Sequence, residues 1–331
     1  MGREETMAST GFVPARICWI TYVLAAASVA LCFSAPPCED PWRVGLLAIC
    51  VATCVVYVFS FAYSNTSIYD PAWCLLPIFV AVGWMLTAKS SPSPRGWYAL
   101  GLFVAWFLRY SLWWPWDGWT VGLRTEDWRY IDLAEKIGGV GRLYWLLSLT
   151  SLHLTPSLLV FFGLGPLQRL WTSGASGAPP LGALDAVAAA VSMAAMLANG
   201  AADTQLWRFR QRAAHPGAAQ HLETEHCAKT CRQGLWAYSR HPNYCCEATF
   251  WLGIAICALA GDTEGAVPMR WAWGGSVVMF MFFRVSASLM DARSLKHRKG
   301  FAKVMQEVPA LLPVPMALDR LLDKILVPGY R

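Results

Sequence analysis

The stretch LWAYSRHPNYCCE, residues 235–247, runs directly into the apolar segment 248–260. It places Arg240, His241 and Asn243 just before the short span predicted at 244–260, and Glu247 in the first turn of that span. Ionisable groups at the edge of a span are costly, and they usually mark a pathway or a binding site. The stretch therefore predicts a membrane protein whose polar site lies at the mouth of a helix bundle.

The composition supports a membrane protein with several spans. The chain has 331 residues, of which 56% are hydrophobic and 15% are charged, and its mean hydropathy is +0.38. These values lie outside those of ordinary soluble domains. We expect an all-α, polytopic membrane helix bundle with about eight transmembrane helices, within a range of about seven to nine. The predicted spans are 16–34, 44–63, 72–88, 97–114, 143–165, 181–199, 244–260 and 271–290.

The charge distribution predicts an orientation. The net charge of +6 needs no nucleic-acid partner, because most Lys and Arg residues fall in segments that face the same side if the spans alternate. Both termini and the loops near 115–142 and 200–243 are then cytosolic. Many of the 18 Trp residues lie near span ends, where an interfacial aromatic belt forms.

The domain organisation follows from the same pattern. We expect a cytosolic N-terminal segment at 1–15, a single membrane-embedded domain at 16–316 and a C-terminal tail at 317–331. Charged, amphipathic residues 124–135 predict a surface helix, and 201–216 continue the sixth span beyond the bilayer. Residues 291–316 predict one amphipathic helix that the Pro-rich VPALLPVP closes.

Five separated blocks resemble one family. LWAYSRHPNYCCE resembles the SRHPNYxGE signature of the steroid 5α-reductase-like proteins, the branch also called DUF1295. NTSIYDPAW at 65–73, RTEDWRY at 124–130, AADTQLWRF at 201–209 and the tail at 289–313 resemble the same family in the same order. The resemblance covers about residues 65–313. It implies an NADPH-dependent reductase in the membrane that acts on a C=C bond of a lipid, sterol-like or prenyl-derived enone, without a Rossmann fingerprint.

The resemblance also implies a cofactor site. Arg240 offers a fork of donors that suits a cofactor phosphate. Asn243 and Glu247, one helical turn apart, would recognise the nicotinamide carboxamide. The full set predicted to bind NADPH is Arg240, His241, Asn243, Tyr244, Glu247, Asp203, Arg124, Arg129, Asp291 and Arg293. Simpler interpretations are helix capping for the SRHPN block and ordinary basic helix flanks for the arginines.

We assign catalysis to Tyr69, Asp70 and Glu247. A reductase must polarise the substrate carbonyl while hydride reaches the β-carbon, so a hydrogen-bond donor or acid is needed near the lipid. Tyr69 or a protonated Asp70 would serve. The alternative for Asp70-Pro71 is an N-cap and N1 pair for the third span. For Arg284, within the eighth span, the alternatives are snorkelling to the interface and a phosphate contact.

Two other functions stay open. An S-adenosylmethionine-dependent methyltransferase of the isoprenylcysteine type resembles the C-terminal region, through its RHPxY block and its tail. Cys245-Cys246 stands where the reductase family usually has Phe-Gly, and Phe301 stands where it has Tyr, so a catalytically degenerate protein of the same fold is the third possibility.

Expectations about metals, partners and location complete the prediction. The residues His221, His226, Cys227 and Cys231 do not have a zinc-ligand spacing, so no metal site is predicted. The expected partners are membrane lipids and a lipid substrate from the bilayer, and no oligomeric state is predicted. The resemblance, rather than any targeting signal, implies the endoplasmic reticulum.

Overall fold

The computed structural model describes residues 12–89, 91–113, 122–172, 179–214, 230–261 and 269–327. Within these residues the chain is helical and forms no strand, and an isolated β-bridge joins Val13 and Leu123. Seven of the described helices are long and apolar enough to cross a membrane. The chain is therefore a multi-pass membrane protein, and the predicted all-α polytopic bundle is confirmed.

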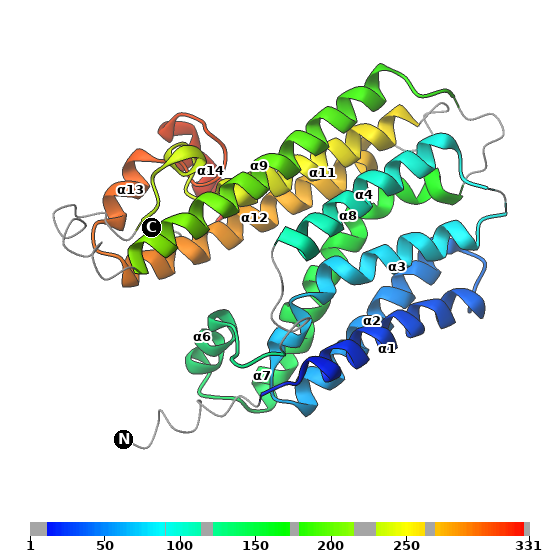
Figure 1. Cartoon of the computed structure of the whole chain (residues 1–331), viewed down its shortest axis with the longest axis horizontal. Coiled ribbons are helices and arrows are strands. Elements are labelled where there is room, and N and C mark those ends of the chain that lie inside the picture. Colours follow the sequence, from blue (N-terminus) through cyan, green and yellow to red (C-terminus); the bar gives the residue numbers. More distant parts are fainter. Residues whose placement is uncertain are drawn as a thin grey trace. The chain divides into compact units, whose positions relative to one another are not determined.

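Figure 1 shows the helices coloured in their order along the chain. Their bounds are α1 (Ala15–Ser34), α2 (Pro41–Ala62), the 3-10 turn η1 (Thr66–Tyr69), α3 (Ala72–Leu86), α4 (Pro94–Trp113), α6 (Trp128–Lys136), α7 (Arg142–Leu147), the π-helical segment η2 (Ser148–Leu154), α8 (Thr155–Thr172), α9 (Ala183–Ala214), the 3-10 turn η3 (Gly234–Ala237), α11 (Pro242–Ala260), α12 (Met269–His297), α13 (Phe301–Glu307) and α14 (Met316–Leu326).

The chain divides into two compact units, which we describe separately. Unit 1 contains residues Met1–Leu181 and Ala258–Trp271, and unit 2 contains Gly182–Cys257 and Ala272–Arg331. The single domain predicted at 16–316 thus contains parts of both units. α4, the fourth predicted span, forms a 20-residue helix but is not among the seven helices with spanning hydropathy.

Unit 1 is a bundle in which α1, α2, α3 and α8 pack against one another. Its core is aromatic: Trp84 and Trp171 are fully buried, and the rings of Trp42 and Phe161 lie 4.4 Å apart. Local sequence explains the start of α2, where Asp40 accepts a hydrogen bond from the Trp42 amide and Pro41 occupies the first turn. These contacts fix the helices that carry the polar cluster of this unit.

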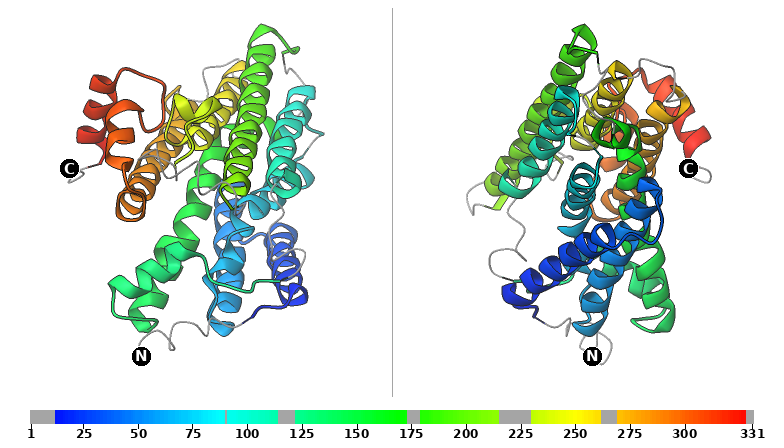
Figure 2. Two further views of the ribbon diagram at one scale, coloured as in Figure 1. Left: turned by 60° about the vertical axis from the view of Figure 1, so that its left-hand side comes forward. Right: turned by 90° about the vertical axis from the view of Figure 1, so that its right-hand side faces the viewer.

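Unit 2 is built on three long helices, α9, α11 and α12, which run alongside one another (Figure 2). α9 and α11 approach closely at Gly253, where an added Cβ would lie 3.0 Å from the Ser192 amide nitrogen and 3.1 Å from the Ala188 carbonyl oxygen. The same Cβ would lie 2.2 Å from the Ser192 hydroxyl oxygen, so a larger residue at position 253 would require the Ser192 side chain to move. This close contact sets the spacing of the two helices that carry the candidate site.

The structure corrects one prediction about the tail. Residues 291–316 are not one helix: α12 continues to His297, Gly300 adopts a φ of 80°, and α13 then ends at Glu307. A left-handed glycine is a common helix stop, and it turns the chain at this point. The helix α14 beyond it was not predicted. The predicted helical continuation of the sixth span is confirmed by the 32-residue α9. A helix in the predicted segment 124–135 is confirmed as α6, although it begins at Trp128. The positions of both segments relative to the bilayer stay predictions.

Candidate functional site

The SRHP block of unit 2 lies beside the C-terminal tail. The Arg240 amide donates to the Pro309 carbonyl at 2.9 Å, and the His241 amide donates to the Ala310 carbonyl at 3.0 Å. The Ser239 hydroxyl also donates to Ala310, at 3.1 Å. These contacts satisfy backbone polar groups just before α11 and hold the block against the tail. The tail is therefore part of the candidate site.

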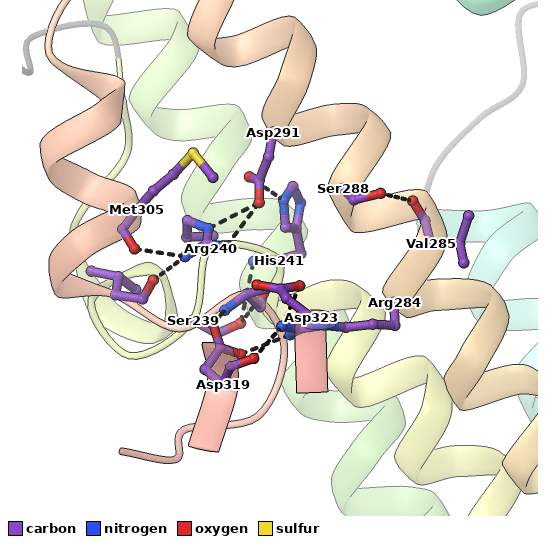
Figure 3. Close-up of polar contacts among 12 residues, drawn as sticks. Ser239, Arg240, His241, Arg284, Val285, Ser288, Asp291, Met305, Asp319 and Asp323 are labelled. Atoms are coloured by element: carbon purple, nitrogen blue, oxygen red, sulfur yellow. Dashed lines mark hydrogen bonds and ion pairs between the residues drawn. The ribbon is translucent and has the colours of Figure 1, made fainter. Parts of the chain in front are cut away.

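The side chains of Arg240 and His241 both point at Asp291 on α12 (Figure 3). Arg240 places Nε and Nη2 at 3.1 and 2.9 Å from Asp291 Oδ2, and His241 Nε2 lies 2.9 Å from Oδ1. The other Arg240 nitrogen donates to the carbonyls of Met305 and Val308. The Arg240 and Asp291 side chains are each only 2% exposed. In this structure Arg240 ties α12 to the tail, and its assignment to a cofactor phosphate stays a prediction.

Two polar pairs join α9 to α11. Asn199 Nδ2 lies 3.4 Å from Glu247 Oε2, and Asn243 Nδ2 lies 3.4 Å from Asp203 Oδ1. Trp251 Nε1 donates to the other oxygen of Glu247 at 3.1 Å. Each helix supplies two residues four positions apart, so the pairs lie one turn apart on facing surfaces. We call these four residues, Asn199, Asp203, Asn243 and Glu247, the α9–α11 ladder.

Positive charges gather beside this end of unit 2. The pKa of the Arg298 guanidinium is lowered from its ordinary value, first by burial and then by the charges of Arg210 and Arg293. Arg210 and Arg293 are exposed residues on α9 and α12. Arginine remains protonated in proteins, so the repulsion persists. An anion bound between these residues would relieve it.

Unit 1 has its own polar cluster around Asp70. Tyr130 donates its hydroxyl to Asp70 Oδ1 at 2.5 Å, and Arg129 Nη2 lies 3.4 Å from the same oxygen. Burial and the neighbouring Asp70 raise the pKa of Tyr130 well above its ordinary value. Tyr130 therefore stays a donor. Asp70 does not cap α3, because the residue before that helix is Pro71 and no side-chain cap is formed.

The loop before α6 is fixed to η1 by a buried carboxylate. Glu126 accepts from the amides of Thr66 and Ser67 at 2.6 and 2.8 Å, and from the Ser67 hydroxyl. Burial raises the pKa of Glu126, and the hydrogen bonds from Ser67, Thr66 and Asp127 offset part of that rise. These contacts hold η1, and with it Tyr69 and Asp70, against the loop.

The hydroxyl of Tyr69 belongs to a separate buried network. It lies 2.8 Å from Ser157 Oγ, which also accepts a hydrogen bond from the Thr53 hydroxyl at 2.8 Å. The ring of His153, from the π-helical segment η2, lies 4.8 Å from the Tyr69 ring. π-helical segments occur often at functional sites. Tyr69 and Asp70 are neighbours in sequence, but their side chains have different partners.

The comparisons with known proteins identify a family. The family model described as protein of unknown function, DUF1295, matches residues 56–308. The chain belongs to the DUF1295 family. No curated protein and no solved structure matches the chain. The match confirms the DUF1295 part of the resemblance and includes the SRHPNY block, the α9–α11 ladder and the Asp70 cluster, but it ends before α14.

The structure groups most of the predicted site residues. In unit 2, Arg240, His241 and Asp291 form one cluster, while Asp203, Asn243 and Glu247 belong to the ladder. Tyr244 stacks on His241 at 5.5 Å. In unit 1, Asp70 and Arg129 are brought together, whereas Arg124 is exposed beside the Val13–Leu123 bridge. His221, His226 and Cys227 lie outside the described residues.

Sequence reasoning missed three partners. Asn199 of α9 donates to Glu247 of α11. The i, i+4 spacing of Asn199 with Asp203 is a sequence signal that would have placed Asn199 on the same helix face as Asp203. Tyr130 was seen only as part of a charged cluster, not as the donor to Asp70. The partner of Arg284 is Asp319 in α14, at 2.7 Å, so Arg284 makes a buried ion pair instead of snorkelling.

Proposed function

We propose that the chain is a membrane-embedded, NADPH-dependent reductase of a C=C bond in a lipid, of the sterol-like or prenyl-derived enone class. Membership of the DUF1295 family and the five blocks that resemble steroid 5α-reductase-like proteins support this activity. The observation that carries the proposal is the α9–α11 ladder. It holds Asn243 and Glu247, the residues that the resemblance assigns to the nicotinamide, on one helix face opposite Asp203.

The chemistry of the ladder fits a nicotinamide carboxamide. That group offers one acceptor oxygen and two N–H donors, and the ladder offers amide donors together with carboxylate acceptors. The Glu247 carboxylate is an acceptor of the kind that the carboxamide N–H groups require, and it already accepts from Asn199 and Trp251. The side chain of Asn243 is half-buried, at the polar end of α11. The residues present therefore suit the cofactor.

The phosphates of the cofactor fit the basic residues at the same end of unit 2. The charges of Arg210 and Arg293 both act on Arg298, and a bound diphosphate would compensate these positive charges. Arg240 has a different role in this proposal. Its buried contacts with Asp291 and the tail position the block that precedes α11, so that Asn243 begins the helix at a fixed place.

NADPH, when bound, would supply the hydride for the reduction. The residues of the chain bind and orient it, and those of unit 1 act on a proton. We assign the proton-donating group to the Asp70–Tyr130 pair, whose 2.5 Å hydrogen bond holds a carboxyl group and a phenol together. We also propose that the protein resides in the endoplasmic reticulum, with both termini in the cytosol.

Replacing Asp70 by asparagine tests the chemical part of the proposal. The substitution keeps size and shape but removes an ionisable group, so lipid-dependent oxidation of NADPH should fall at least about 100-fold. NADPH binding should be retained, because Asp70 is not one of the cofactor residues in this proposal. The measurement is NADPH consumption by purified protein in lipid nanodiscs supplied with a panel of lipid enones.

Two outcomes would contradict this assignment. Full activity of Asp70→Asn would show that the carboxyl group is not needed. Consumption of S-adenosylmethionine instead of NADPH, with methyl transfer to a lipid or prenylated thiol, would replace the reductase with a methyltransferase.

A further inference from the structure

Helix α14 has an unusual distribution of side chains. Its acidic residues Asp319 and Asp323 face the protein, and Asp319 is only 1% exposed. Its aliphatic residues Leu318, Leu321 and Ile325 are 44, 51 and 63% exposed. The spacing of i, i+3 and i+7 places these three on one face of the helix. The acidic face of this amphipathic helix is therefore turned toward the protein, and its aliphatic face is uncovered.

The acidic face is held by Arg284 of α12 (Figure 3). Arg284 Nη1 lies 2.7 Å from Asp319 Oδ1, and Nη2 lies 2.6 Å from Asp323 Oδ1 and 2.9 Å from the Asp319 carbonyl. The second Asp319 oxygen accepts from the Ala310 amide at 3.1 Å. Burial raises the pKa of Asp323, although the charge of Arg284 opposes the rise. The helix is thus attached to α12 through charged groups.

The attachment point lies inside a membrane span. Arg284 belongs to the spanning segment Trp273–His297, and it is 1% exposed. Met281 and Val285, beside it on α12, are each 43% exposed. Apolar side chains that are uncovered on a spanning helix face lipid. A charge at this depth is costly unless it is paired, and α14 supplies the pair. α14 is therefore held next to a lipid-facing surface.

We propose that α14 is an interfacial helix whose exposed apolar face, Leu318, Leu321 and Ile325, lies in the lipid of the bilayer. The exposed residues Arg320 and Lys324 lie along one edge of that face, where they suit anionic lipid head groups. An 11-residue helix is about 16 Å long, which is sufficient to lie in the plane of the interface. This proposal does not depend on the reductase activity.

A second copy of the chain is the less suitable occupant. Three partly exposed aliphatic side chains offer much less than the roughly 800 Å² per partner that a stable interface buries. The neighbouring exposed residues of α12 also belong to a spanning segment, so lipid is already next to the attachment point. The continuous apolar surface therefore favours lipid.

Photo-crosslinking tests the proposal on the full chain. The photoreactive phenylalanine analogue p-benzoylphenylalanine replaces Leu321 in one sample and Lys303 of α13, whose side chain is 71% exposed, in the control. Both proteins are placed in nanodiscs of defined phosphatidylcholine and phosphatidylserine, irradiated and analysed by intact mass. We expect a lipid adduct at Leu321 at least tenfold more abundant than at Lys303. Raising the phosphatidylserine fraction should increase the adduct at Leu321.

Two results would overturn the proposal. One is a covalent dimer at Leu321 in place of a lipid adduct, which would identify a second copy as the occupant. The other is equal, background-level lipid labelling at Leu321 and Lys303, which would place the apolar face outside the bilayer. A parallel sample with the analogue at Met281, an exposed position on α12, verifies that lipid contacts are captured in the same nanodiscs.

Discussion

Replacing Arg284 by alanine is expected to lower the free energy of unfolding of unit 2 by about 3–5 kcal/mol. The substitution leaves Asp319 and Asp323 facing each other without the cation between them. Asp319 is almost fully buried, so its negative charge has no solvent to stabilise it. The loss should also detach α14, because the other side-chain contact described for Asp319 is with the Ala310 amide.

Unfolding of the purified protein in detergent with increasing denaturant measures this effect. The matched control is Arg232→Ala, which removes a pair with Glu307 of similar length, 2.6 Å, in which both side chains are more than a third exposed. An exposed pair of this kind contributes at most about 1 kcal/mol. If the two variants lose the same stability, Arg284 is not paired with the tail as described. Combining Arg284→Met with Asp319→Leu and Asp323→Leu should recover much of the stability, because a well-packed apolar replacement removes the unpaired charges.

Replacing Arg240 by alanine should cost a similar amount, about 3–5 kcal/mol, even when no nucleotide is present. Arg240 neutralises Asp291 and donates to the Met305 and Val308 carbonyls in a buried place. Without it, Asp291 Oδ2 and two carbonyl oxygens lose the donor that Arg240 supplies, while Asp291 Oδ1 keeps its contact with His241. Arg240→Lys should restore little of this stability, because an ammonium group cannot reproduce the fork of the guanidinium.

The stability of Arg240→Ala without nucleotide distinguishes the two roles proposed for this residue. If the variant unfolds at the wild-type denaturant concentration and loses only NADPH binding, Arg240 is a phosphate ligand and the tie to Asp291 is dispensable. If it is unstable without nucleotide, the tie is the main role. For this reason Arg240→Ala is a poor variant for a test of cofactor binding.

The membrane fold could be predicted because its physical signal is local. Long apolar segments can be recognised from the hydropathy of the sequence. Asn243 and Glu247 can be recognised because they follow Pro242 and lie one helical turn apart. The tail could not be predicted in the same way. Gly300 interrupts a sequence that is otherwise compatible with a helix, and its left-handed conformation is visible only in the structure.

The partners of the buried charged residues could not be predicted from the sequence either. Arg240 and Asp291 are 51 positions apart, and Arg284 and Asp319 are 35 apart. A sequence presents each as a single charged residue with several interpretations, such as a phosphate contact or snorkelling. Only the structure shows that Arg240 and Arg284 both connect α12 to the tail. The i, i+4 spacing of Asp319 and Asp323 was an available signal for a helix in the tail.

Nucleotide binding to unit 2 tests the central claim most directly. The measurement is thermal unfolding of the purified protein with NADPH, NADH or S-adenosylmethionine, for the wild type, Asn243→Ala and Asn65→Ala. Asn65 is the matched control, since it is an asparagine of unit 1 whose amide makes no hydrogen bond within the described part of the chain.

We expect NADPH to stabilise the wild type and Asn65→Ala, by roughly 2.7 kcal/mol at a hundredfold excess over the dissociation constant. Asn243→Ala should lose that shift while unfolding near the wild-type temperature without nucleotide. Stabilisation by S-adenosylmethionine alone, or by no nucleotide, would contradict the proposed reductase.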